Sequence, residues 1–198
     1  EDQFPAIVND NVVMLGNYFF NLFLIRGTKK SALFEVGISA VVDTVIKQLE
    51  GLDISPDYII VSHPHSDHLT GLEGLAARFD NAQIITGSGA AEFISHPKAG
   101  PVTLKEDKFM SQSLNGLGIR PGRPPIEDLP DLSDTISVES QMLLDLGGVC
   151  LSLKKVEGHS PGNLIGLIEK SKILFSSDSL GFHFPGRVFL PLYFTGAR

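Results

Sequence analysis

Hydrophobic residues in the first 36 positions fall into four short runs, which occupy 7–8, 12–15, 18–25 and 32–36. Polar turns separate these runs, and Asn9-Asp10-Asn11 offers the side-chain chemistry of a tight hairpin turn. The runs therefore predict four strands. Strands that follow one another before any helix predict an antiparallel edge of a sheet.

The hydrophobic spacing becomes helical after position 39. Apolar positions recur every three or four residues up to 49, with Ser39 as the expected N-cap and Gly51 as the expected C-cap. Further helices are predicted over 69–79, 88–95 and 103–117, and strands over 58–61 and 82–86. Gly71 and Gly74 lower the helicity of the 69–79 segment, but they would allow it to pack closely beneath the preceding loop.

Strand patterns return near the C-terminal end, over 136–138, 142–146, 149–156, 164–168 and 173–175. The preceding 120–134 stretch has four prolines and no periodicity, so it is either a plain connection or a lid over a site. On periodicity alone, this order of elements supports an α+β or a mixed α/β fold.

The densest group of metal-ligating side chains directly follows the strand predicted over 58–61. His63, His65, Asp67 and His68 lie within six residues, where a buried strand opens into a loop. Imidazole and carboxylate ligands suit zinc, iron or manganese, and the cluster has no thiolate for a structural zinc site. Histidine and aspartate at this spacing predict a metal site rather than a solvated polar loop.

The His-X-His-X-Asp-His pattern resembles that of the metallo-β-lactamase superfamily of binuclear metallohydrolases. The resemblance implies that His63 and His65 bind one metal ion, and that Asp67 and His68 bind the second. It also implies an αββα sandwich formed by residues 1–198 as a single domain. In this α+β fold, two mixed β-sheets pack face to face and helices lie on the outer faces.

Two later motifs resemble further parts of the superfamily's ligand set. His159 lies in a Gly-His-Ser-Pro-Gly turn and would be the third ligand of the first site. Asp178 ends a Leu-Phe-Ser-Ser-Asp run and would bridge both metal ions through its carboxylate. The superfamily's final histidine has no counterpart here, since His183 is better interpreted as a pocket or packing residue and His96 as a helix-end residue. We therefore expect the natural protein to continue beyond residue 198.

Glu35 departs from the superfamily pattern, because most members have an aspartate there that supports the metal loop. Together with the Ser-Asp-Ser-Leu-Gly run at 177–181 and Pro191-Leu192-Tyr193, it resembles a subgroup similar to the quorum-signalling effector thioesterase of the quinolone pathway. By analogy with that subgroup, an ester or a thioester is the favoured substrate class.

Composition and charge limit the classes of partner. A net charge of −7 leaves no electrostatic footprint for nucleic acid or for an anionic membrane surface. No apolar run approaches the roughly 20 residues that span a bilayer. The single cysteine, Cys150, is expected to be a small packing residue and favours a cytoplasmic location. We expect a small-molecule substrate and leave a homodimer open.

The expected activity is that of a metal-dependent hydrolase. Two divalent metal ions, with zinc favoured and iron or manganese as alternatives, would share a water molecule and lower its pKa towards neutrality. The resulting hydroxide would attack a carbonyl or phosphoryl centre, and Asp67 would act in catalysis by orienting this nucleophile. Two alternatives stay open. One is a di-iron oxygen or nitric oxide reductase, which His65 disfavours because that class has a carboxylate there; the other is a regulatory protein with a vestigial metal site.

Overall fold

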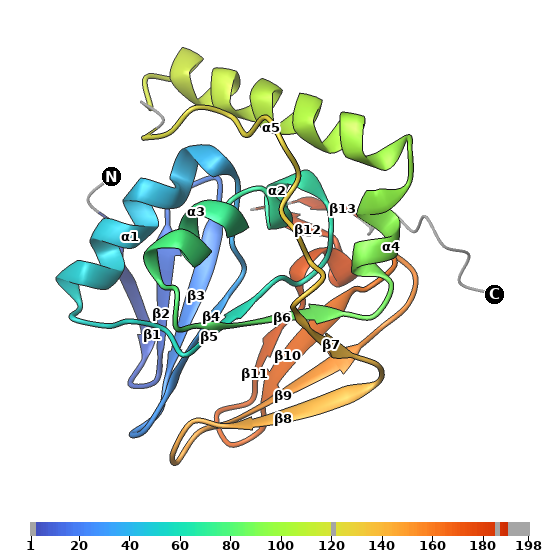
Figure 1. Ribbon diagram of the computed structural model, residues 1–198. Helices are drawn as coiled ribbons and strands as arrows, with labels where there is room; N and C mark the ends of the chain where they lie inside the picture. Colours follow the sequence, from blue (N-terminus) through green and yellow to red (C-terminus); the bar gives the residue numbers. More distant parts are fainter. Residues whose placement is uncertain (1–2, 120–121, 185–186, 190–198) are drawn as a thin grey trace.

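The computed structural model describes residues 3–119, 122–184 and 187–189, with side chains described up to Gly181. Figure 1 shows two packed β-sheets, with helices on the side of the larger sheet that faces away from the smaller one. None of the helices in this part of the chain combines the length and the apolar composition needed to cross a membrane.

The larger sheet has seven strands in the order in which they occur along the chain. Its first four strands pair antiparallel, which confirms the predicted antiparallel edge. The remaining strands pair parallel, and helices occupy the long crossovers that parallel pairing requires. The strands are β1 (Ala6–Asn9), β2 (Val12–Gly16), β3 (Asn21–Arg26), β4 (Ser31–Phe34), β5 (Tyr58–Ile60), β6 (Gln83–Gly87) and β7 (Ile136–Val138).

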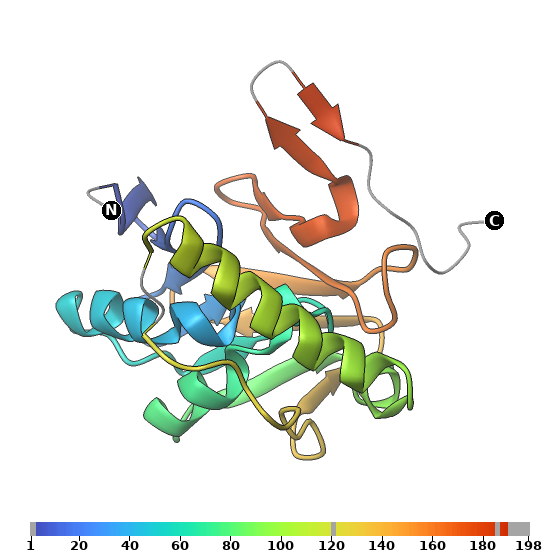
Figure 2. The same cartoon turned by 90° about the horizontal axis from the view of Figure 1, so that it is seen from above.

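The smaller sheet has four strands, and all of its pairings are antiparallel rather than mixed. The reason is that short turns join β8 to β9 and β10 to β11, and a tight turn can join only antiparallel neighbours. The strands are β8 (Gln141–Asp145), β9 (Cys150–Lys155), β10 (Leu164–Ile168) and β11 (Ile173–Phe175). A 3-10 helix, η2 (Ser177–Leu180), and a hairpin of β12 (Phe182–Phe184) and β13 (Arg187–Phe189) follow, and Figure 2 shows this hairpin standing out from the sandwich.

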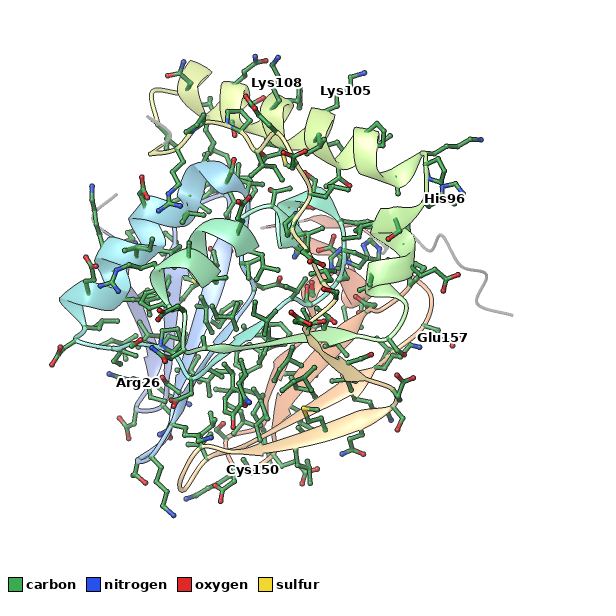
Figure 3. All side chains as sticks on the ribbon, in the orientation of Figure 1. Arg26, His96, Lys105, Lys108, Cys150 and Glu157 are labelled. Atoms are coloured by element: carbon green, nitrogen blue, oxygen red, sulfur yellow. The ribbon has the colours of Figure 1, made fainter. Side chains whose placement is uncertain are left out.

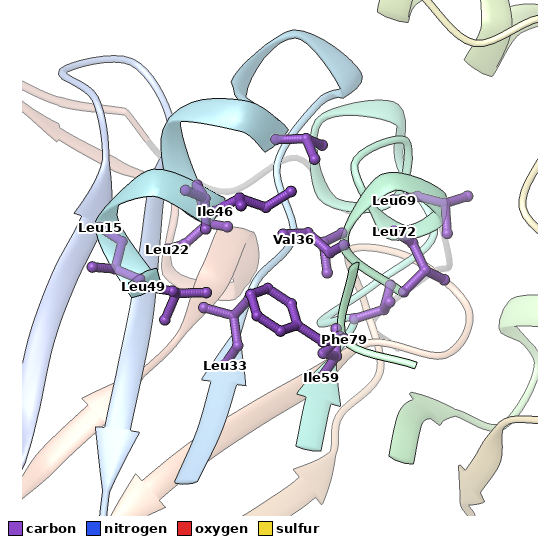
Figure 4. Close-up of a cluster of buried hydrophobic side chains, with 14 of the residues drawn as sticks. Leu15, Leu22, Leu33, Val36, Ile46, Leu49, Ile59, Leu69, Leu72 and Phe79 are labelled. Carbon is purple, nitrogen blue, oxygen red and sulfur yellow. The ribbon is translucent and has the colours of Figure 1, made fainter. Parts of the chain in front are cut away.

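Two apolar cores hold the layers together, and they confirm the predicted sandwich. One core lies between the helices and the larger sheet, where Leu33 and Ile59 belong to the same cluster as Ile46 and Leu49 of the first helix (Figure 4). The other lies between the two sheets, where Phe34 and Ile60 belong to the same cluster as side chains of the smaller sheet. Strand alternation explains this division, because neighbouring residues of one strand point to opposite faces. The helices are α1 (Val42–Gly51), α2 (Ser66–Leu69), α3 (Leu72–Arg78), α4 (Ala90–Ser95) and α5 (Ala99–Gly116), with the 3-10 helix η1 (Ser39–Val41) before α1.

Three local predictions need correction. The predicted 69–79 helix is interrupted, because α2 ends at Leu69 and α3 begins only at Leu72. Gly71, between them, packs against the backbone of Val36, where an added Cβ would lie 2.1 Å from the Val36 oxygen. Ser39 does not cap α1; its hydroxyl donates to Asp107 instead. Cys150 is exposed on the outer face of β9, near the lower edge of the molecule in Figure 3.

Helix α5 packs on the rest of the molecule through a small apolar cluster, in which Leu114 meets Ile38 and Val41, and through buried polar side chains. Its buried residues include Thr103, Asp107 and Ser111. The Asp107 carboxylate is fully buried and accepts hydrogen bonds from the Ser39 backbone N–H (3.2 Å), the Ser39 hydroxyl (2.7 Å), the Thr70 hydroxyl (2.7 Å) and the Ile126 backbone N–H (3.0 Å). These contacts fix α5 against η1 and against the end of α2.

Candidate metal centre

Three connections carry the side chains of the predicted metal site. The first leaves β5, contains His63 and His65 and leads into α2, which carries the adjacent Asp67 and His68. The second leaves β9 and contains His159. The third leaves β11 and leads into η2, which carries Asp178. The site is therefore built from both sheets.

The imidazole rings of His63, His65 and His159 converge on one point. His63 Nε2 lies 3.1 Å from His65 Nδ1 and 3.2 Å from His159 Nε2, and the His65 and His159 nitrogens are 3.0 Å apart. Two nitrogens bound to one tetrahedral zinc ion lie roughly 3.3 Å apart, given Zn–N bonds of about 2.0–2.1 Å. The three nitrogens therefore fit the ligand positions around a single ion.

A second group lies directly beside these three rings. His68 Nε2 is 3.4 Å from Asp67 Oδ2 and 3.5 Å from Asp178 Oδ1. The other oxygen of Asp178, Oδ2, is 3.5 Å from His159 Nε2, so this carboxylate faces both groups. The Asp67 side chain is 38% exposed, whereas the His68 side chain is 15% exposed, so Asp67 lies at the solvent side of the centre.

The fully buried hydroxyl of Ser62 connects the two groups from behind. Ser62 Oγ donates a hydrogen bond to Glu35 Oε2 at 2.9 Å, and the same oxygen of Glu35 lies 2.9 Å from His68 Nδ1. Ser62 Oγ also lies 3.0 Å from His63 Nδ1 and 2.9 Å from Ser177 Oγ. One buried carboxylate and one hydroxyl therefore support a histidine from each group.

The count of hydrogens in this network favours a hydrogen on Nδ1 of both rings. A serine hydroxyl has a single hydrogen, so if Ser62 donates it to Glu35, a hydrogen bond between Ser62 and His63 requires the hydrogen on His63 Nδ1. The Nε2 lone pair of His63 then faces the other two rings. Glu35 accepts the Nδ1 hydrogen of His68 in the same way, which leaves Nε2 of that ring facing the carboxylates. Hydrogen bonds of this kind orient metal-binding histidines in proteins.

Two residues of this network have left-handed backbone conformations that are unfavourable for a residue with a side chain. Glu35 has a φ of 78° and Ser177 a φ of 46°. Such conformations cost roughly 1–3 kcal/mol each and persist only where surrounding contacts hold them. In Glu35 the side chain gains the hydrogen bonds to Ser62 and His68, and its backbone N–H donates to the Ile60 oxygen at 3.0 Å.

Burial and neighbouring charges separate the histidines by their pKa values. Burial, together with the adjacent imidazoles, lowers the pKa of His63 well below its ordinary value and that of His65 to about 4, so both rings are neutral at neutral pH. Burial also opposes the charged form of His68, but the carboxylates of Glu35 and Asp67 outweigh it and raise the pKa of this ring. Burial likewise opposes ionisation of Asp67, yet His68 lowers the pKa of that carboxyl to about 2. A cation bound at the second group would therefore displace a proton from His68.

Replacing Ser62 by alanine should weaken metal binding by about 10- to 100-fold, because the Nδ1 hydrogen of His63 loses its acceptor. The dissociation constant can be measured by competition with a chromophoric chelator, with the thermal unfolding midpoint recorded alongside. Ser95→Ala provides a matched control, since the Ser95 hydroxyl donates to the Ala91 oxygen of its own helix and, in the part of the chain that the structure describes, to no residue of the metal centre. An unchanged metal affinity in Ser62→Ala would show that the network does not orient the rings.

The structure brings all six predicted site residues together. His63, His65 and His159 form the first group, His68 and Asp178 lie beside His63, and Asp67 joins them through its contact with His68. His96 ends α4, as predicted, and the side chain of His183 lies outside the described part of the chain. Ser62 and Ser177 were missed, although the direct adjacency of each to a predicted ligand is a signal that could have identified them.

Comparison with solved structures agrees with this fold. A metallo-beta-lactamase from Cronobacter sakazakii with a mutated HARLDQ motif has a TM-score of 0.61 and 20% identity over 85% of this chain and 60% of its own. A metallo-beta-lactamase superfamily protein from the archaeon Sulfolobus tokodaii has a TM-score of 0.63 and 25% identity over 91% of this chain and 68% of its own. A metallo-beta-lactamase from Novosphingobium pentaromativorans has a TM-score of 0.61 and 17% identity over 85% of this chain and 57% of its own.

The chain spans about 60% of the length of the first of these structures. No curated protein sequence matches it significantly. The sequence profile of the metallo-beta-lactamase superfamily, however, matches residues 16–197, a range that includes every residue of the two groups. The match to this profile and the convergence of the three histidine rings in the structure lead to one conclusion: this protein belongs to the metallo-beta-lactamase superfamily.

Proposed function

We propose that this protein is a metal-dependent hydrolase that acts on an ester or a thioester. The observation that carries the proposal is the meeting of three histidine nitrogens within 3.0–3.2 Å of one another, beside a second group of one histidine and two carboxylates. Members of the superfamily are typically metal-dependent hydrolases, and this donor set suits their ions.

Two divalent metal ions are the proposed cofactors, with zinc favoured and iron or manganese as alternatives. His63, His65 and His159 would hold the first ion, and Asp67, His68 and Asp178 the second, with Asp178 facing both. When bound, the ions would lower the pKa of a shared water molecule towards neutrality. Asp67 is exposed at the opening of the site, where its carboxylate can orient that water.

The reaction needs no oxidant and no further co-reactant. Water supplies a hydroxyl to the carbonyl carbon, the C–O or C–S bond breaks, and the alcohol or thiol leaves with the remaining proton. A cavity of about 350 Å³ opens beside Asp67, His68 and Asp178, and its walls include Phe19 and Phe175. Apolar walls around a polar floor suit a small molecule with an apolar part.

The proposal is tested by elemental analysis of protein purified without added metal, followed by a panel of substrates. We expect close to two metal ions per chain, turnover of a p-nitrophenyl ester or an acyl thioester, loss of this activity after chelation, and recovery when metal is restored. Bis-p-nitrophenyl phosphate and a β-lactam are the comparison substrates. Bound metal without turnover of any panel member would favour a regulatory role, and consumption of dioxygen or nitric oxide would favour a redox enzyme.

A further inference from the structure

A groove of about 620 Å³ lies between α4, the start of α5 and the turn after His159. We call it the α4–α5 groove. Its volume is within the roughly 300–1,000 Å³ typical of small-molecule sites. Its walls are Phe93, Ala99, Val102 and Pro161, with Glu92 and Lys98 at its edge. His96, labelled at the end of α4 in Figure 3, also lies along it.

The α4–α5 groove adjoins the metal centre on the side of the first group. The ring of Phe93 meets the ring of His65 edge to face, with 5.9 Å between their centroids. Pro161 belongs to the same turn as His159, two residues further along the chain. The centre therefore has one hollow on each side, since the cavity beside Asp67 and His68 adjoins the second group.

Close backbone packing fixes the floor of the groove. An added Cβ at Gly87 would lie 2.2 Å from the Gly162 oxygen, and one at Gly162 would lie 2.7 Å from the Ala90 backbone nitrogen. The start of α4 and the turn that carries Pro161 therefore touch with no room for side chains. A wall held in this way keeps its shape when a ligand enters.

The groove's chemistry favours an apolar ligand over a charged one. Val102 is 51% exposed although it is aliphatic, and Phe93 and Pro161 add further apolar surface beside it. If the groove instead bound a leaving group that carries phosphate, several positively charged side chains would have to converge on it. Among the residues described along the groove, only Lys98 and His96 can be cationic, and the His96 ring already accepts a hydrogen bond from the Lys98 backbone N–H at 3.2 Å.

We propose that the α4–α5 groove binds the apolar acyl chain of the substrate, with the scissile carbonyl between the two groups of metal-ligating residues. This assignment rests on the proposed function, since it places the acyl side of an ester or a thioester beside His65 and Phe93. The leaving group then lies on the opposite side, towards the cavity beside Asp67.

The test is a series of p-nitrophenyl esters, from acetate through butanoate to octanoate, hydrolysed by the metal-loaded protein. For the wild type we expect kcat/KM to rise with acyl length, by up to about fourfold for each methylene that enters the groove. Val102→Glu should lower the ratio of kcat/KM for octanoate to kcat/KM for acetate by at least tenfold. Phe109→Glu is the matched control, because Phe109 lies seven residues further along α5, is 67% exposed and does not line the groove.

Equal chain-length dependence in the wild type and in Val102→Glu would overturn the assignment. A second series, of acetate esters with alcohol chains of increasing length, could also overturn it. If kcat/KM rises with the length of the alcohol chain in the wild type but not in Val102→Glu, the groove binds the leaving group instead. If the wild type hydrolyses neither an ester nor a thioester, the proposed function fails, and the assignment of the groove is then tested separately by measuring octanoate binding by calorimetry. Binding that Val102→Glu weakens at least tenfold, and Phe109→Glu does not, supports the groove; binding that is absent, or equal in both variants, overturns it.

Discussion

Replacing His159 by alanine should remove metal from the first group and abolish hydrolysis in the same step. This ring supplies one of three converging nitrogens, and its Nε2 also faces Asp178 Oδ2 at 3.5 Å, so the second group loses a neighbour too. A four-ligand zinc site contributes roughly 10–16 kcal/mol of binding, or about 3 kcal/mol per ligand if divided evenly. The loss therefore corresponds to at least about a hundredfold weaker metal binding.

Elemental analysis and kcat/KM for the best ester measure the two losses on one preparation. His63→Ala should behave in the same way, because its Nε2 belongs to the same three atoms. His96→Ala is the matched control for metal content, since it also removes an imidazole but does so at the end of α4, outside both groups. Activity that survives in His159→Ala or His63→Ala would contradict the mechanism, whatever the metal content.

Asp107→Ala should lower the free energy of unfolding by roughly 3–5 kcal/mol. The carboxylate is fully buried and accepts four hydrogen bonds, from Ser39, Thr70 and Ile126. Each buried donor that loses its acceptor costs about 1–3 kcal/mol. The loss also removes one of the two hydrogen bonds that hold α2 to α5, since Thr70 loses its acceptor whereas the Ser66 hydroxyl still donates to the Thr103 oxygen.

Urea denaturation followed by circular dichroism measures this effect. Asp107→Asn keeps the shape and one acceptor oxygen but turns an NH₂ group towards the donors, so it should cost less than alanine. Glu106→Ala is the matched control, because the neighbouring Glu106 is exposed on the same helix. A change below about 1 kcal/mol in Asp107→Ala would show that the hydrogen bonds do not carry the docking of α5.

Local sequence patterns were enough to predict where most elements lie. The alternation of apolar runs and turns located the early hairpins, and the antiparallel edge followed from strands that precede any helix. The third strand begins only at Asn21 instead of position 18, because the Asn17 side chain accepts hydrogen bonds from the N–H groups of Phe19 and Phe20 and forms a turn. Side-chain competition of this kind is hard to weigh from apolar pattern alone.

The residues of the candidate site also differ in how far the sequence alone identifies them. His63, His65, Asp67 and His68 are visible as one cluster, whereas His159 and Asp178 could be connected to it only through resemblance to known motifs.

The hydrogen-bond partners of Ser62 and Asp107 could not be predicted from local pattern, although Ser62 stands directly beside a predicted ligand. The hydrogen-bond partner of Ser62 is Glu35, 27 residues away, and Asp107 meets Ser39 across 68 residues. From the sequence alone, an aspartate in the middle of a helix is expected to be a solvated surface residue, because the groups that donate hydrogen bonds to it come from distant parts of the chain.

The division of the ligand set between the two sheets has a consequence for unfolding. His63, His65 and His68 follow a strand of the larger sheet, and His159 and Asp178 follow strands of the smaller one. Bound ions would therefore act as reversible cross-links between the two layers, joining positions 96 residues apart. At a free metal concentration 1,000 times the dissociation constant, such linkage adds about 4 kcal/mol to the stability of the native state. Resistance to heat should then depend on metal supply, as it depends on disulfides in proteins that have them.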